Sequence, residues 1–169
     1  ELTSGSTWHA AGLMPLFNMS YSVGQIHKYS VKFYQELEKE TGQDVGFREV
    51  SNIRLAETQD RMDEYKQYAG VAETIGVKVN FLNPDEIKEI WPLCSTEGLI
   101  GAIQHPEDGY IQPNDLTQAL AKGARALGAE IYRQTAVTAL EQLPDDSWIV
   151  TTDKGEIKCD IVVSCSGNF

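Results

Sequence analysis

A run of small residues and hydroxyls near the start of the chain constrains its fold most, because it stands directly before an apolar stretch and a helix. Residues 4–13 read Ser-Gly-Ser-Thr-Trp-His-Ala-Ala-Gly-Leu. Gly5 and Gly12 allow close approach to the backbone, and the hydroxyls and amides can hydrogen-bond phosphate or ribose oxygens of a large ligand. His9 is the reactive side chain of the segment. The same composition is typical of a tight connection between a strand and a helix, in which His9 is only packed or hydrogen-bonded, so the residues alone leave both interpretations open.

The charge balance argues against two classes of partner. The 169 residues include 14 Lys and Arg against 25 Asp and Glu, a net charge of -11. Such a surface repels nucleic acid and anionic membranes, so we expect no nucleic-acid partner and no membrane partner. The longest aliphatic run, residues 161–163, is too short to cross a bilayer, and we find no basic and apolar leader. We therefore expect a cytoplasmic location.

The cysteines and histidines do not form a recognisable metal-binding or disulfide pattern. Cys94, Cys159 and Cys165 stand in apolar surroundings with no Cys-x-x-Cys pair, which predicts reduced, buried thiols. The histidines at positions 9, 27 and 105 lack the close spacing of a zinc site. We therefore expect no metal. The tryptophans are interpreted as core or interface aromatics: Trp8, Trp91 and Trp148.

Apolar spacing and end signals predict the helices. The first spans about residues 22–41, with Ser22 and Gln25 as a capping box and Gly42 as its left-handed end. Its expected buried stripe is Ile26, Tyr29, Phe33 and Leu37. The other predicted helices are residues 59–75, ended by Gly76; a short helix that begins at Asn83-Pro84-Asp85-Glu86; and residues 116–127, opened by Pro113-Asn114-Asp115 and ended by Gly128.

The remaining apolar segments predict strands. Extended structure is expected at residues 45–58, 77–81, 98–104, 130–133, 137–143, 148–152 and 156–163. Residues 161–163 are apolar on both sides, which is typical of a buried sheet strand whose carboxyl end opens onto a ligand crevice. Between residues 104 and 113, the Asp108-Gly109 pair flanked by prolines predicts a turn.

These elements indicate an α/β fold with two interleaved lobes. Residues 1–25 and 107–169 are assigned to a partial nucleotide-binding sheet domain, and residues 26–106 to a substrate-side lobe. An imidazole, two carboxylates and a phenol stand close together within residues 105–110, which also suits acid–base chemistry. We prefer the interpretation of this stretch as a structural link into the next helix.

The string at residues 1–13 closely resembles the flavin-carrying segment of dimethylglycine and sarcosine dehydrogenases. Other segments fall in the order and spacing of this family: residues 29–34, 38–42, 52–56, 106–113, 119–128 and 165–167. The resemblance covers essentially the whole chain and places it among the D-amino-acid-oxidase-like flavoproteins. It implies a partial FAD-binding sheet domain with an interleaved substrate-side lobe.

Two features of the family are absent from these residues. No Gly-x-Gly-x-x-Gly turn occurs in residues 1–169, and by the resemblance Glu1 falls where the strand that carries the ribose-binding acid would be ending. We therefore expect the sequence to be an excerpt of a larger protein, inactive in isolation and prone to form homo-oligomers through unpaired strand edges.

The resemblance also implies a set of cofactor-binding residues. His9 matches the residue whose neutral imidazole attaches to the 8α carbon of the flavin. The full set is Gly5, Ser6, Thr7, Trp8, His9, Ala10, Ala11, Gly12, Leu13, Val137 and Gly167. Val137 would contact the adenine side, and Gly167 would close a turn over the nucleotide. No catalytic residue is assigned within the chain.

The function that this resemblance implies is FAD-dependent oxidation of a small N-methylated amino acid, dimethylglycine or sarcosine, by hydride transfer to flavin. The expected partners are the amine substrate and folate, the latter through a domain outside this chain. Two alternatives stand beside it. One is a non-catalytic regulator resembling the regulatory subunit of pyruvate dehydrogenase phosphatase, and the other is an FAD-dependent oxidase of other amino acids.

Overall fold

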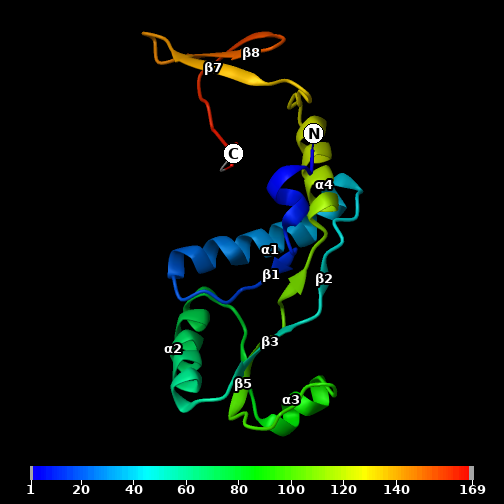
Figure 1. Ribbon diagram of the computed structural model, residues 1–169, viewed down its shortest axis with the longest axis vertical. Coiled ribbons are helices and arrows are strands. Elements are labelled where there is room, and N and C mark those ends of the chain that lie inside the picture. The colour runs from blue at the N-terminus through cyan, green and yellow to red at the C-terminus, as the bar shows by residue number, and fades with distance from the viewer. Residues whose placement is uncertain (1, 168–169) are drawn as a thin grey trace.

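The computed structural model describes residues 2–167 and shows a mixed helix-and-strand fold of elongated shape (Figure 1). Its helices are the 3-10 helix η1 (Gly5–His9), α1 (Tyr21–Thr41), α2 (Gln59–Ile75), α3 (Pro84–Ile90) and α4 (Pro113–Ala126). Its strands are β1 (Leu13–Met14), β2 (Arg48–Glu49), β3 (Asn52–Ala56), β4 (Asn80–Leu82), β5 (Gly101–His105), β6 (Gly109–Tyr110), β7 (Val137–Gln142), β8 (Trp148–Thr152) and β9 (Gly155–Cys159).

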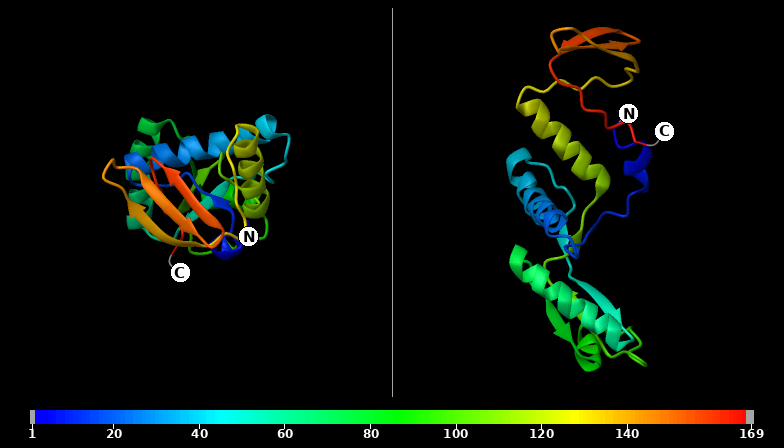
Figure 2. Two further views of the ribbon diagram at one scale, coloured as in Figure 1. Left: turned by 90° about the horizontal axis from the view of Figure 1, so that it is seen from above. Right: turned by 90° about the vertical axis from the view of Figure 1, so that its left-hand side faces the viewer.

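The described strands form antiparallel three-stranded sheets at successive levels of the molecule. Their orders are β1-β6-β2, β3-β5-β4 and β7-β8-β9. The β7-β8-β9 sheet forms one end, α1, α4 and the β1-β6-β2 sheet lie in the middle, and the β3-β5-β4 sheet lies at the other end (Figure 2). The proposed division into residues 1–25 with 107–169 and residues 26–106 stays a prediction, and β2, from the second group, pairs with β6, from the first.

Helices α2 and α3 cover opposite faces of the β3-β5-β4 sheet. On one face, Tyr68 of α2 packs with Ala56 and Ile103 in a fully buried cluster. On the other face, Ile87 of α3 packs with Leu82 and Ala102. Burying a side chain of this size contributes about 1.5–3 kcal/mol to stability. The sheet therefore has a core on each side.

The N-cap of helix α1 lies two residues earlier than the sequence predicts, and the helix begins at Tyr21. Ser20, not Ser22, is the N-cap, and its hydroxyl accepts a hydrogen bond from the Val23 amide at 3.5 Å. The Asn18 carboxamide oxygen accepts from the Ser20 amide at 2.8 Å, and this local turn brings Ser20 into the cap position. Gly42 ends the helix with φ 64°, as predicted.

The predicted buried stripe of α1 is wrong in its N-terminal half. Ile26 is 62% exposed and Tyr29 is 70% exposed, whereas Gly24, Val31 and Leu37 are buried. At Gly24 an added Cβ atom would come within 2.6 Å of Ile75 Cδ1, so α1 approaches α2 through this glycine. Close approach through Gly24 turns the neighbouring apolar side chains away from the core.

Helices α2, α3 and α4 begin where the sequence predicts, or within a few residues of that point. For α3 the capping box is complete: the Asn83 side chain accepts from the Asp85 and Glu86 amides, and the Glu86 carboxylate accepts from the Asn83 amide. This arrangement satisfies amide donors that have no partner within the helix.

Replacing the α3 cap should measurably weaken the fold. We expect Asn83→Ala to lower the free energy of unfolding by about 1 kcal/mol, because the amides of Asp85 and Glu86 lose their acceptor. Urea unfolding checks this value. Asn83→Asp is the matched control, since it keeps an acceptor oxygen at the cap, and equal losses in both variants would contradict the capping role.

The C-terminal part differs most from the predicted strands. Residues 130–133 form no strand, and β9 ends at Cys159 instead of continuing to residue 163. Ile161 and Val163 are 79% and 78% exposed, so the predicted buried strand is wrong in this structure. An extended segment becomes a sheet strand only when neighbours accept and donate its hydrogen bonds. Within the described residues, no strand pairs with this segment.

Two expectations about side-chain burial are correct only in part. Cys94 is buried as predicted, but Cys159 is half-buried and Cys165 is exposed; all three thiols are free. Trp8 is 78% exposed and Trp91 is 49% exposed, so neither lies in a core of the described structure, and their role as interface aromatics stays a prediction. Apolar neighbours in sequence do not bury a side chain unless another element packs over it.

Candidate cofactor site

The segment from residue 4 to residue 13, here called the cofactor loop, lies on the surface as a single 3-10 turn that continues into β1. No residue of η1 is buried. Gly5 has φ 67°, a conformation that L side chains rarely adopt, and among residues 2–167 no atom lies within 4 Å of an added Cβ. Gly5 is therefore required by backbone conformation, and the space beside it is open.

His9 ends the 3-10 turn with one ring nitrogen already engaged. Its Nδ1 lies 2.9 Å from the Gly5 carbonyl oxygen, and because a carbonyl only accepts, Nδ1 carries the hydrogen. In the neutral imidazole the lone pair then resides on Nε2. His9 is an exposed residue, so its ring is accessible at the surface of the loop.

Gly12 has a different reason for being glycine. Its φ is 72°, and an added Cβ atom would overlap the Ile111 carbonyl oxygen. The Ile111 amide donates to the Gly12 carbonyl at 2.8 Å, next to the pairing of Leu13 with Tyr110. The close approach that the sequence indicates at Gly12 is thus an approach of the chain to itself, which fixes the end of the cofactor loop against β6.

Two cavities flank the loop. One of about 350 Å³ is lined by residues 2–5 and Trp8. A second of about 150 Å³ lies between the loop and the start of α4, and its lining includes Thr7, Ala10, Gln112 and Asn114. The second cavity presents a hydroxyl and two side-chain amides, which can donate to or accept from a ligand.

These features fit a large, flat cofactor such as FAD. The exposed small residues Ala10 and Ala11 let a ring system lie against the backbone, and Leu13, which is 67% exposed, offers an apolar edge. Polar groups of the two cavities stand beside this surface. The residues present are therefore compatible with one side of a FAD site.

The structure does not bring all the predicted cofactor residues together. Residues 5–13 form one continuous surface. Val137 is the first residue of β7, pairs with Thr152 and is 58% exposed in a different sheet. Gly167 has φ 78°, and the segment before it runs back from the β7-β8-β9 sheet toward the level of η1 (Figures 1 and 2). The assignments of Val137 and Gly167 stay predictions.

A buried polar cluster lies where the β1-β6-β2 sheet meets the β3-β5-β4 sheet. It is the main feature that the sequence did not reveal. Asp108 is 1% exposed and accepts from the Leu16 amide at 2.9 Å. His105 and Tyr68 are fully buried; His105 Nε2 lies 3.1 Å from the Tyr68 hydroxyl, and that hydroxyl donates to the Leu16 carbonyl at 3.3 Å. The turn before β6 lies at Pro106 and Glu107, not at Asp108-Gly109.

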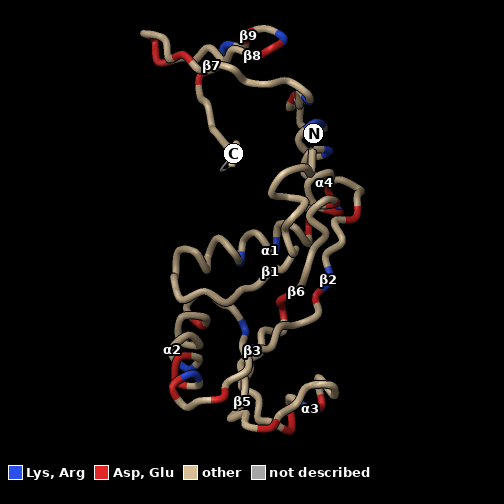
Figure 3. Tube along the Cα trace, viewed as in Figure 1, with Lys and Arg blue, Asp and Glu red and all other residues tan. Residues whose placement is uncertain are grey.

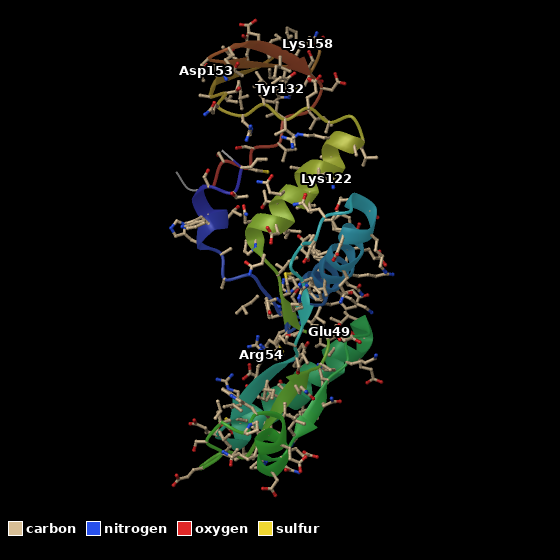
Figure 4. The ribbon with its side chains drawn as sticks, turned by 90° about the vertical axis from the view of Figure 1, so that its right-hand side faces the viewer. Glu49, Arg54, Lys122, Tyr132, Asp153 and Lys158 are labelled. Atoms are coloured by element: carbon tan, nitrogen blue, oxygen red, sulfur yellow. The ribbon has the colours of Figure 1, made fainter. Side chains whose placement is uncertain are left out.

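Arg54 and Phe17 complete this cluster. The Arg54 guanidinium carbon lies 4.3 Å from the centre of the Phe17 ring, which also contacts the rings of Tyr68 and His105. Arg54 lies where the β3-β5-β4 sheet meets the middle of the molecule (Figure 4). Asn52, Arg54, His105, Asp108 and His27 each have a buried side-chain polar atom without a hydrogen-bond partner among the described residues.

Burial shifts the pKa values within this cluster. It raises the pKa of Asp108 to about 6, although the Leu16 amide and the charge of Arg54 act in the opposite direction. It lowers the pKa of His105 to about 4, with Arg54 adding to the effect, and raises that of Tyr68 to about 12. Desolvation disfavours the charged form of each group. Perturbed values favour no catalytic assignment here, because these groups are enclosed by packing on every side.

The described part of the chain shows no group of three or more His, Cys, Asp or Glu side chains arranged to hold a metal ion.

Among the helices described, none is both long and apolar enough to cross a membrane. Asp and Glu are interspersed with Lys and Arg along the chain and gather at α2 and α3 (Figure 3).

Comparison with known proteins gives a consistent result. The family model described as "FAD dependent oxidoreductase" matches residues 1–169. The chain is 40% identical to mitochondrial dimethylglycine dehydrogenase of Rattus norvegicus, over 99% of this chain and 20% of that protein. It is 33% identical to human mitochondrial sarcosine dehydrogenase, over 99% of this chain and 19% of that protein. The chain therefore spans about a fifth of the length of these curated relatives.

A solved structure supports the same assignment. The L-proline dehydrogenase of P. horikoshii superimposes with a TM-score of 0.88 and 27% identity, covering 96% of this chain and 43% of that one. The predicted cytoplasmic location stays a prediction, and both curated relatives are named as mitochondrial proteins. By the family model that matches its whole length and by the fold that it shares, the chain belongs to the FAD-dependent oxidoreductases of the D-amino-acid-oxidase type.

Proposed function

We propose that the whole protein oxidises a small N-methylated amino acid, dimethylglycine or sarcosine, with FAD attached covalently to His9. The observation that carries this proposal is the geometry of the cofactor loop, in which the Gly5 carbonyl accepts from Nδ1 of the exposed His9, so that Nε2 is the nitrogen with the lone pair. The relatives named as dimethylglycine and sarcosine dehydrogenases support the substrate class.

The role of His9 follows from which nitrogen can act as a nucleophile. A protonated or hydrogen-bearing nitrogen has no free lone pair, so attachment through Nδ1 would first require loss of its bond to the Gly5 carbonyl. Nε2 needs no such change. The 3-10 turn thus selects the tautomer and fixes the ring orientation before the cofactor arrives.

The other residues of the loop bind and orient. Thr7 lines the smaller cavity with Ala10, and its hydroxyl can bond a ribitol, ribose or phosphate oxygen. When bound, FAD supplies the acceptor for a hydride from the N-methyl carbon of the substrate. The chain's own contribution is to hold the ring system against Ala10, Ala11 and Leu13 and to keep that face free of bulky side chains.

Reduction of the bound flavin tests the proposed reaction. We expect dimethylglycine or sarcosine to bleach the flavin absorbance of the purified whole protein under anaerobic conditions and to release formaldehyde with an artificial electron acceptor. Glycine, which lacks the N-methyl group, is the matched control and should do neither. A flavin that is reduced by proline or by glycine, and by neither N-methylated compound, would contradict the substrate class. A flavin that none of these compounds reduces would contradict catalysis and favour the regulatory alternative.

A further inference from the structure

Asp108 connects three segments that are far apart in the sequence. Its side-chain Oδ1 accepts from the Leu16 amide at 2.9 Å. Its backbone carbonyl accepts from the Val50 and Ser51 amides at 3.1 Å and 2.9 Å. Ser51 has φ 70°, so the Asp108 carbonyl stabilises a strained bend between β2 and β3. Asp108 thus joins the chain that follows the cofactor loop to the β1-β6-β2 and β3-β5-β4 sheets.

The Leu16 bond completes a clamp on the chain that leaves the cofactor loop. At one end, the Ile111 amide donates to the Gly12 carbonyl at 2.8 Å, and Leu13 and Met14 pair with β6. At the other end, only Asp108 and the Tyr68 hydroxyl hydrogen-bond the backbone of Leu16 within the described structure. A two-residue strand pairing is weak by itself, so a bond beyond each of its ends decides its register.

The surroundings of Asp108 make this bond strong. The carboxylate is buried, and a hydrogen bond from a backbone amide to a buried carboxylate is charge-assisted and little screened by water. The groups whose charges act on it are His27 of α1, Arg54 of β3 and Glu107 of the preceding turn, and Tyr68 of α2 feels its charge in return. Its second oxygen, Oδ2, is buried without a partner among the described residues.

We propose that the Asp108 side chain is a positioning group, which fixes residues 12–16 against β6 and thereby sets the placement of the cofactor loop. The expected effect on flavin attachment rests on the proposed function, since a displaced loop presents His9 less well to flavin. Its immediate effect, the protection of the Leu16 amide, does not depend on flavin. Asp108 touches neither substrate nor cofactor in this role and acts through the Leu16 backbone.

Amide hydrogen exchange and flavin attachment, measured together in the whole protein, test the proposal. In Asp108→Ala we expect exchange of the Leu16 amide to become at least tenfold faster, and covalent flavin formation at least fivefold slower, with the circular dichroism spectrum unchanged. Asp108→Asn keeps an acceptor oxygen and should retain both properties within about twofold. Glu107→Gln removes the neighbouring, partly exposed charge, which pairs with Lys78 at 3.0 Å, and is the matched control expected to change neither.

Leu16 exchange and flavin attachment in these variants decide whether Asp108 is a positioning group. Unchanged Leu16 exchange in a folded Asp108→Ala protein would overturn the proposal, as would equal flavin loss in the Glu107→Gln control. If Asp108→Ala does not fold, Asp108→Asn decides, because loss of Leu16 protection in that variant would also overturn it. Wild-type protein without covalent flavin would refute the proposed function of His9 and leave the Leu16 exchange measurement valid.

Discussion

His9→Ala in the whole protein is expected to release all of its flavin on denaturation, whereas the wild-type protein keeps its yellow colour and in-gel fluorescence. The change removes the attaching nitrogen and one hydrogen bond, from Nδ1 to the Gly5 carbonyl. Because η1 has no buried residue, the fold should lose no more than about 0.5 kcal/mol, the usual range for surface substitutions. Flavin fluorescence after gel electrophoresis in detergent measures the attached fraction.

A second histidine provides the control for this experiment. His27 lies on α1, outside the cofactor loop, and His27→Gln should keep the flavin attached through detergent treatment. Flavin that remains bound in denatured His9→Ala, or wild-type flavin that washes away, would contradict attachment at His9. In either case, His9 would return to the role of a residue that only stabilises the 3-10 turn.

Local signals in the sequence predicted most of the helix ends, the N-cap of α1 excepted. Gly42 and Gly76 adopt φ values of 64° and 69°, and Asn83 caps α3 at the predicted start of that helix. Each of these signals acts within a few residues, because glycine relieves a local steric restriction and a cap satisfies local amide donors. No distant contact is needed to make them correct.

Signals that depend on distant neighbours were less reliable. The apolar spacing of Ile26 and Tyr29 is helical, yet Gly24 determines which side of α1 meets α2. The apolar run at residues 161–163 has the composition of a buried strand, but composition does not supply the partner strands that such a segment needs. Sequence periodicity identified the element type and could not identify the packing partner.

The candidate site shows the same difference between features that are local in the sequence and features that depend on distant segments. The cofactor loop could be identified from its residues and its resemblance, because its features are contiguous in sequence. The cluster around Asp108 could not, because Leu16, Tyr68 and Arg54 reach it from separate segments. The proximity of His105 and Asp108 in the sequence was the one available signal; it supported the preferred interpretation as a structural link, with acid–base chemistry as the alternative, and it did not indicate that the two side chains are buried.

Two single substitutions in this cluster should give stability profiles that slope in opposite directions with pH. Asp108 has a pKa of about 6 in the folded protein against 3.8 ordinarily, so between these values the folded state binds more protons than the unfolded chain. The free energy of unfolding therefore falls as pH rises through this window. At about 1.4 kcal/mol for each pKa unit, ionisation of Asp108 lowers the free energy of unfolding by about 3 kcal/mol over the whole window.

His105 acts with the opposite sign. Its pKa is about 4 in the folded protein against 6.5 ordinarily, so the unfolded chain binds more protons between these values. The free energy of unfolding therefore rises with pH through this window, again by about 3 kcal/mol. In the wild-type protein the two effects largely cancel between pH 4 and 6.

Removing either Asp108 or His105 should reveal the pH dependence of stability that the other residue causes. Relative to wild type, we expect Asp108→Asn to gain about 2 kcal/mol of unfolding free energy as pH rises from 4 to 6, and His105→Gln to lose a similar amount, because part of each 3 kcal/mol effect falls outside this range. Urea unfolding followed by tryptophan fluorescence measures both profiles. Slopes of the same sign in the two cluster variants would contradict this account, because neutralising a buried acid and removing a buried base change the proton balance of folding in opposite directions.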